Sequence, residues 1–182
     1  MPRIPYPDLA SLPQKQQEFM ARVDRNVNVF RMLAWAESVF EHWHRLGNAL
    51  LHRTAVDAVT REIAILRVGH LMQARYEVHQ HERIAARVGM PPAKIVALRA
   101  PDLAAFDARE AALIRFTDEV VRNVRASDDA FSQLQRHFDN RQVAELVLLI
   151  GYYQMTCTFL ENLDIPIEDE GVIENPYERM GG

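Results

Sequence analysis

The chain has 182 residues, 48% of them hydrophobic and 25% charged, which is typical of a folded globular protein with a core of its own. Its formal net charge of −4 gives no electrostatic basis for binding nucleic acid or an anionic membrane. No apolar run reaches the ~18 residues of a membrane-spanning helix, and the first residues lack the apolar stretch of a secretory signal.

Apolar residues recur with a period near 3.6 and glycines number only seven, which predicts an all-α protein of about six or seven helices. We expect one domain over residues 1–182, with an extended arm over about 1–13, because this arm contains four prolines. The single cysteine, Cys157, cannot form an internal disulfide. This fits a reducing compartment, so we expect a cytoplasmic protein.

The first half of the chain predicts three helices. Apolar residues at helical spacing predict one from about Asn28 to His52. Thr54, followed by Asp57 three residues later, resembles a capping box and predicts the start of the next helix, which carries Glu62. The third is expected from about Ala74 to Gly89, since glycine commonly follows the last helical turn.

The second half predicts three further helices, each preceded by a capping residue. They are expected from Asp107 to about Val124, from Ser127 to about Phe138, and from Asp139 or Asn140 to about Leu160. The last segment, about 165–182, is acidic and interrupted by proline and glycine. It is interpreted as a tail that lies on a surface or on a partner.

Two acidic residues and a histidine form the most informative pattern. Glu77 and His81 are four residues apart and therefore share one face of a helix. Glu62 precedes Glu77 by fifteen residues, which on one straight helix is a separation of roughly 22 Å. A carboxylate in so apolar a helix needs a partner. We therefore predict a sharp turn between His70 and Ala74 that brings Glu62 to the Glu77/His81 face.

Together these side chains would form a proton-transfer set, with Tyr76 as a fourth member. Imidazole both takes and gives a proton near neutral pH, which makes His81 the main catalytic candidate. Simpler interpretations exist: Glu62 as a surface charge, Glu77 and His81 as a solvated pair worth ~0.3 kcal/mol, and Tyr76 as a core aromatic.

A metal site is a further interpretation of these residues. Glu62, Glu77 and His81, joined by His70 or His79, could supply carboxylate and imidazole ligands. Recognised spacings such as His-Glu-x-x-His are absent from the sequence. We therefore expect no metal and no other cofactor.

The residues of this pattern resemble those of the carboxymuconolactone decarboxylase family, which includes the AhpD-like alkylhydroperoxidases. In AhpD-like members a Glu is followed twelve residues later by Cys-x-x-Cys, and a His follows the second Cys by four. On this chain the Glu falls on Glu62 and the His on His81, whereas Ala74 and Glu77 stand at the cysteine positions. The resemblance is clearest over about 54–89 and is to a cysteine-free branch.

The resemblance implies an AhpD-like helical bundle that assembles as a homo-oligomer, a trimer or a hexamer. It also implies a cofactor-free lyase that acts on a small organic acid or lactone. In such an enzyme His81 would deliver a proton, while Glu62 and Glu77 set its tautomer and return the proton. Either Arg75 or Arg67 would hold an acid group of the substrate.

Two alternatives remain open. An AhpD-like peroxidase is disfavoured because its cycle needs a pair of thiols, which Ala74 and Glu77 cannot supply. A non-catalytic oligomeric binding protein would keep the fold and lose the activity.

Overall fold

The computed structural model describes residues 1–23, 27–100 and 102–168. Within these ranges the chain forms nine α-helices, two short 3-10 helices and no strand, which confirms the predicted all-α class. The elements in chain order are η1 (Leu9–Ser11), α1 (Gln14–Met20), α2 (Asn28–Leu33), α3 (Phe40–His52), α4 (Ala58–Leu71), α5 (Arg75–Arg87), α6 (Pro92–Ala97), η2 (Leu103–Ala105), α7 (Ala108–Asn123), α8 (Asp128–Gln135) and α9 (Asn140–Asn162).

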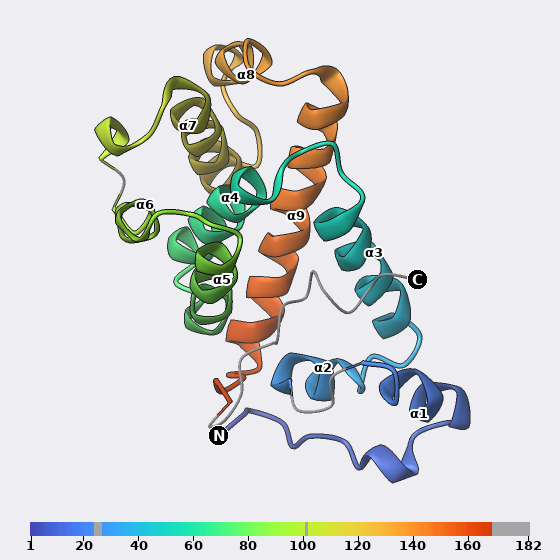
Figure 1. The fold of residues 1–182 in the computed structure, drawn as a ribbon. Coiled ribbons are helices and arrows are strands. Elements are labelled where there is room, and N and C mark those ends of the chain that lie inside the picture. Colours follow the sequence, from blue (N-terminus) through green and yellow to red (C-terminus); the bar gives the residue numbers. More distant parts are fainter. Residues whose placement is uncertain (24–26, 101, 169–182) are drawn as a thin grey trace.

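Helix α9 runs through the middle of the molecule, with α4 and α5 on one side and α3 on the other (Figure 1). Helices α7 and α8 cover one end of this arrangement, and α1 and α2 lie at the opposite end. The N-terminal arm starts beside the end of α9, where the Arg3 backbone N–H donates to the Leu163 carbonyl at 2.9 Å.

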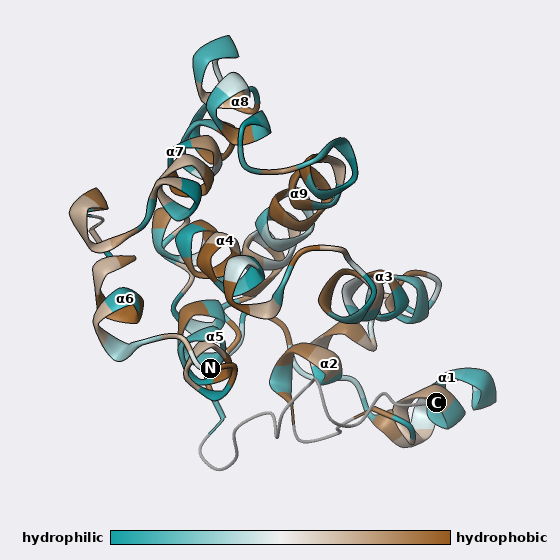
Figure 2. Ribbon diagram, turned by 45° about the horizontal axis from the view of Figure 1, so that its top comes forward, coloured by the Kyte–Doolittle hydropathy of each residue, from teal (hydrophilic) through white to brown (hydrophobic). Residues whose placement is uncertain are grey.

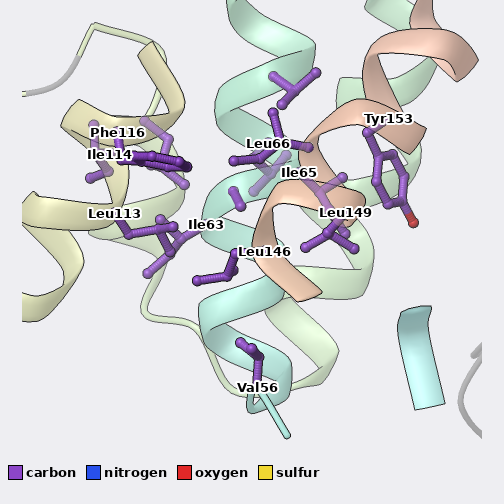
Figure 3. Close-up of a cluster of buried hydrophobic side chains, with 14 of the residues drawn as sticks. Val56, Ile63, Ile65, Leu66, Leu113, Ile114, Phe116, Leu146, Leu149 and Tyr153 are labelled. Atoms are coloured by element: carbon purple, nitrogen blue, oxygen red, sulfur yellow. The ribbon is translucent and has the colours of Figure 1, made fainter. Parts of the chain in front are cut away.

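The core lies where α4, α7 and α9 meet, as the labelled side chains in Figure 3 show. Helix α4 is buried on all sides, with ten consecutive buried residues from Thr60 to Gly69. Apolar residues dominate α4 and α9 in Figure 2. A helix enclosed in this way can hold a charged side chain only if another group in the interior pairs with it.

Among the described helices, α9 is long and apolar enough to cross a membrane by length and composition, although the sequence alone predicted no such helix. Half of its most apolar stretch is buried inside the fold, as in the core helix of a globular protein.

The predicted helix from about 28 to 52 is wrong in one respect, because it is two helices. Helix α2 ends at Leu33 and α3 begins at Phe40. In the turn between them the Trp35 indole N–H donates to the Pro5 carbonyl at 2.8 Å. This contact with the N-terminal arm is remote in sequence, so local periodicity could not reveal it.

The capping residues were mostly predicted correctly. Asp107, Ser127 and Asp139 each accept a hydrogen bond from the third residue of α7, α8 and α9. The exception is the start of α4, where Asp57, not Thr54, is the capping residue. The Thr54 hydroxyl instead donates to the Leu50 carbonyl in the preceding helix.

Two short helices, α1 and α6, were not predicted, because each lies in a proline-containing segment that suggests a loop. Gly89 does follow the end of α5, in a left-handed conformation with φ of 90°. Of the acidic tail predicted over 165–182, residues 169–182 lie outside the described residues.

Helices α4 and α5 form an antiparallel hairpin whose close approach depends on Gly69. A Cβ atom at this position would lie 3.0 Å from Cγ2 of Val78 on α5. We expect Gly69→Val to push the two helices apart and to lower the free energy of unfolding by about 1–3 kcal/mol, measured by urea denaturation.

The matched control is Gly151→Ala on α9, where an added Cβ meets no atom within 4 Å. Alanine is the better helix former, so this variant should be at least as stable as the native chain. A Gly69→Val protein of native stability would show that the close approach is not required.

Candidate active site

His81 lies between the carboxylates of Glu62 and Glu77. Its Nδ1 is 2.7 Å from Oε2 of Glu62, and its Nε2 is 3.0 Å from Oε1 of Glu77. Glu62 is 0% exposed, and the other two residues are also buried. We call these three residues the acid–imidazole trio.

The turn between α4 and α5 brings the trio together. Helix α4 ends at Leu71 and α5 begins at Arg75, and Gln73 between them has a φ of 56°. Both parts of the geometric prediction are confirmed: the chain turns between His70 and Ala74, and Glu62 comes within hydrogen-bonding distance of His81.

The two carboxylates decide the charge of His81. Burial alone lowers the pKa of an imidazole, but the negative charges and hydrogen bonds of Glu62 and Glu77 outweigh it and raise the His81 pKa to about 10. At neutral pH the ring is therefore an imidazolium that donates one N–H to each carboxylate.

A cavity of about 100 Å³ opens beside the trio, and we call it the site cavity. Helices α2, α3, α5 and α9 form its walls, which are largely apolar. Glu77 and His81 line it, whereas Glu62 lies behind His81 and does not. An apolar cavity of ~150 Å³ holds one benzene molecule, so a ligand here is no larger than a single small ring.

Aromatic side chains form much of the cavity wall. Trp43 stacks on Tyr152 with ring centroids 5.1 Å apart, and the Tyr153 ring meets the His81 ring edge to face at the same distance. Gly47 makes room for this packing, because a Cβ there would lie 2.3 Å from the Tyr152 hydroxyl. The cavity thus offers flat apolar surfaces next to one charged wall.

Tyr76 also lines the cavity, and it leads to a residue that the sequence reading missed. Its hydroxyl donates to Oε1 of Glu168 at 2.5 Å, and Gln80 Nε2 donates to Oε2 of the same carboxylate at 2.7 Å. Burial, together with the hydrogen bond to Glu168 and the negative charge of that residue, raises the Tyr76 pKa. Part of the segment interpreted as a surface tail therefore reaches the edge of the site.

The two arginines proposed as substrate contacts lie elsewhere. The Arg67 guanidinium pairs with Asp118 and donates to the Leu98 carbonyl at 3.1 Å. Arg75 lines a neighbouring cavity of about 330 Å³. Among the described residues that line the site cavity there is no arginine or lysine. This placement gives no support to a substrate contact by either arginine.

Cys157 lies on α9 and is 0% exposed. Burial and the negative charges of Glu77 and Glu161 raise the pKa of its thiol, so it stays protonated at neutral pH. A protonated, enclosed thiol is a poor nucleophile. The sequence contains no second cysteine that could complete a dithiol pair.

Residues 37–119 match the model of the carboxymuconolactone decarboxylase family. This range contains all three residues of the acid–imidazole trio and confirms the family resemblance seen in the sequence. A comparison with curated proteins found no match.

Solved structures with the same fold cover nearly all of the chain. One is described as an alkylhydroperoxidase AhpD core, an uncharacterized peroxidase-related protein from Ralstonia eutropha JMP134, with a TM-score of 0.80, 20% identity, and coverage of 92% of this chain and 93% of that one. A peroxidase-related protein from Silicibacter sp. TM1040 has a TM-score of 0.78, 17% identity, and coverage of 92% and 91%.

A third is a variant of the debrominase Bmp8 in complex with 2,3,4-tribromopyrrole, with a TM-score of 0.75, 14% identity, and coverage of 92% of each chain. At these identities the three structures establish the AhpD-like fold and nothing about activity.

The raised pKa of His81 predicts how stability depends on pH. Because its folded pKa of about 10 lies above the value of ~6.5 expected in the unfolded chain, the folded state binds the extra proton. This contribution is fully present below pH ~6.5 and is lost as the pH rises through about 10. We expect the free energy of unfolding to fall over that interval in urea denaturation.

In Glu62→Gln the decline should be shallower, because one of the two charges that raise the His81 pKa is gone. The control is His137→Gln, which replaces an exposed histidine and should leave the native slope unchanged. Equal slopes in Glu62→Gln and the native chain would refute the electrostatic explanation.

Proposed function

We propose that the protein is a cofactor-free lyase that decarboxylates a small organic acid or lactone by proton transfer through the acid–imidazole trio. The observation that carries this proposal is the buried hydrogen-bonded chain from Glu62 through His81 to Glu77, which ends at an apolar cavity. The match of residues 37–119, which include the trio, to the model of the carboxymuconolactone decarboxylase family supports it.

The geometry favours roles for the three residues that differ from those suggested by the sequence. Both ring nitrogens of His81 are bonded to carboxylates, so neither is free to face a substrate. Glu77 is the carboxyl that lines the cavity, and we assign it the direct proton transfer. His81 supplies that proton to Glu77, and Glu62 fixes the orientation of the imidazolium.

In the proposed reaction the bond between the substrate carbon and its carboxylate breaks, and carbon dioxide leaves. The electron pair stays on the carbon, which takes a proton from Glu77 after the His81 imidazolium has passed its Nε2 proton to the Glu77 carboxylate. Solvent then restores the proton on His81. The apolar aromatic walls keep water from the departing carboxylate, which favours loss of its charge.

A dithiol peroxidase is the weaker alternative. Ala74 and Glu77 occupy the positions of the two thiols, and Cys157 is enclosed in the core.

The debrominase among the structural relatives indicates that this fold accommodates small ring compounds in at least one protein. Replacement of a ring substituent by a proton is the chemistry that we infer for the present chain.

The test is a screen of small keto, hydroxy and lactone acids for release of carbon dioxide. With any active substrate, Glu77→Gln should lower kcat by ~10²–10⁴, the contribution typical of general acid–base catalysis. Glu82→Gln is the matched control, because Glu82 is on the same helix but pairs with Arg99 outside the cavity. Full activity in Glu77→Gln would exclude the proposed role.

We also propose a homo-oligomer, a trimer or a hexamer. Helix α9 leaves Val147, Leu148 and Met155 exposed, and Trp35 is 52% exposed between α2 and α3. Exposed apolar side chains grouped on one helix are typical of a protein interface.

Light scattering should give a multiple of the mass of one chain, and Leu148→Glu should shift the measured mass toward that of the monomer. A native monomer at micromolar concentration would contradict this.

A further inference from the structure

The carboxylate of Glu168 sits in a site made of three hydrogen-bond donors from two helices. The Asn28 backbone N–H donates to its Oε1 at 2.6 Å, and the Tyr76 hydroxyl donates to the same oxygen at 2.5 Å. Gln80 Nε2 donates to the other oxygen, Oε2, at 2.7 Å. Both carboxylate oxygens are therefore bound.

The two side-chain donors belong to the wall of the site cavity. Tyr76 and Gln80 are each 3% exposed, and both line the cavity together with Glu77 and His81. In sequence, Tyr76 directly precedes Glu77 and Gln80 directly precedes His81. The two residues that hold the carboxylate are therefore adjacent in sequence to Glu77 and His81, the two members of the acid–imidazole trio on α5.

The donors around Glu168 are neutral. In the part of the chain that the structure describes, none of the ion pairs includes Glu168. Arg31, which is on α2 with Asn28, donates to Oδ1 of Asn28 at 3.1 Å. Hydrogen bonds to an ionised carboxylate are stronger than those between neutral groups, and nothing in this donor set is specific to a glutamate side chain.

We propose that the Asn28 N–H, the Tyr76 hydroxyl and the Gln80 amide form the carboxylate subsite for the substrate, and that Glu168 occupies it as an internal stand-in when substrate is absent. A small organic acid binds by displacing Glu168, with its carboxylate on these donors and its ring in the site cavity. The inference rests on the proposed function in taking an organic acid as the substrate.

Charge balance supports exchange over simultaneous binding. A second carboxylate bound beside that of Glu168 would place two like charges at a subsite whose three hydrogen-bond donors are all neutral. When a substrate carboxylate replaces that of Glu168, the number of negative charges at the subsite does not change. The exchange also supplies the recognition of an acid group that neither Arg67 nor Arg75 provides at the cavity.

The attachment of the segment allows such an exchange. Ile165 is buried in the core and anchors the chain, whereas Pro166 is held by one hydrogen bond, from Asn28 Nδ2 to its carbonyl at 3.0 Å. Beyond Ile165, the described contacts of the segment gather on Asn28, Tyr76 and Gln80. Glu168 can therefore leave the subsite by rotation of the chain after Ile165, without unfolding a helix.

The experiment measures benzoate binding by isothermal titration calorimetry. Glu168→Ala should bind benzoate at least about tenfold more tightly than the native chain, because no internal carboxylate competes. Glu168→Gln, which keeps the shape and removes the charge, should also bind more tightly. Glu161→Ala is the matched control: it removes an exposed carboxylate near the end of α9 and should retain the native affinity.

Two further measurements identify the subsite. Adding Tyr76→Phe to Glu168→Ala should reverse the gain in benzoate affinity, and benzyl alcohol, which lacks the carboxylate, should not distinguish the native chain from Glu168→Ala. In the native chain, saturating benzoate should increase hydrogen exchange at residues 167 and 168, which lie beyond the Ile165 anchor. The hydrogen-exchange measurement uses the native chain, so it does not depend on the folding of a variant.

An affinity for benzoate that is no higher in folded Glu168→Ala or Glu168→Gln than in the native chain overturns the proposal. Unchanged exchange at residues 167 and 168 with benzoate bound does the same. The assay measures binding, so it is separate from the test of the lyase. If benzoate displaces Glu168 while Glu77→Gln retains full turnover, the subsite stands and the proton relay is rejected.

Discussion

The fully buried carboxylate of Glu62 is the constraint on which the rest of this structure depends. It sits in a helix that is enclosed on all sides, where an unpaired charge would cost several kcal/mol. Only a donor from another element can satisfy it, and His81 on α5 does so. Three other features support this pairing. They are the reversal of the chain after Leu71, the close approach of Gly69 to Val78 and the second carboxylate at Glu77.

The same constraint explains why much of the site could be predicted from the sequence. A carboxylate among apolar residues signals a missing partner, and helical spacing places Glu77 and His81 on one face. These two local rules were enough to predict the turn and the meeting of Glu62 with His81. The helices α4, α5, α7 and α9 followed in the same way from periodicity and capping residues, since both depend on neighbours in the sequence.

What the sequence could not reveal depends on contacts between distant residues. Glu168 reaches Tyr76 across 92 positions, and no pattern in an acidic segment distinguishes it from its neighbours. Trp35 reaches Pro5 across 30 positions and accompanies the break between α2 and α3. The apolar pair Ile165 and Ile167 around Pro166 was the one available signal that this segment is not wholly a surface tail. Rules based on neighbouring residues in the sequence do not predict such long-range partners.

The attachment of the N-terminal arm has a practical consequence. Arg3 bonds to Leu163 through its backbone and to the Asn162 carbonyl through its side chain, and Met1 lines the same cavity as Ile165 and Ile167. The first residues of the chain therefore lie against the segment that carries Glu168. An affinity tag joined to Met1 would begin beside this segment, at the cavity next to the candidate active site. Binding studies on this chain are therefore best made after removal of any tag at this end.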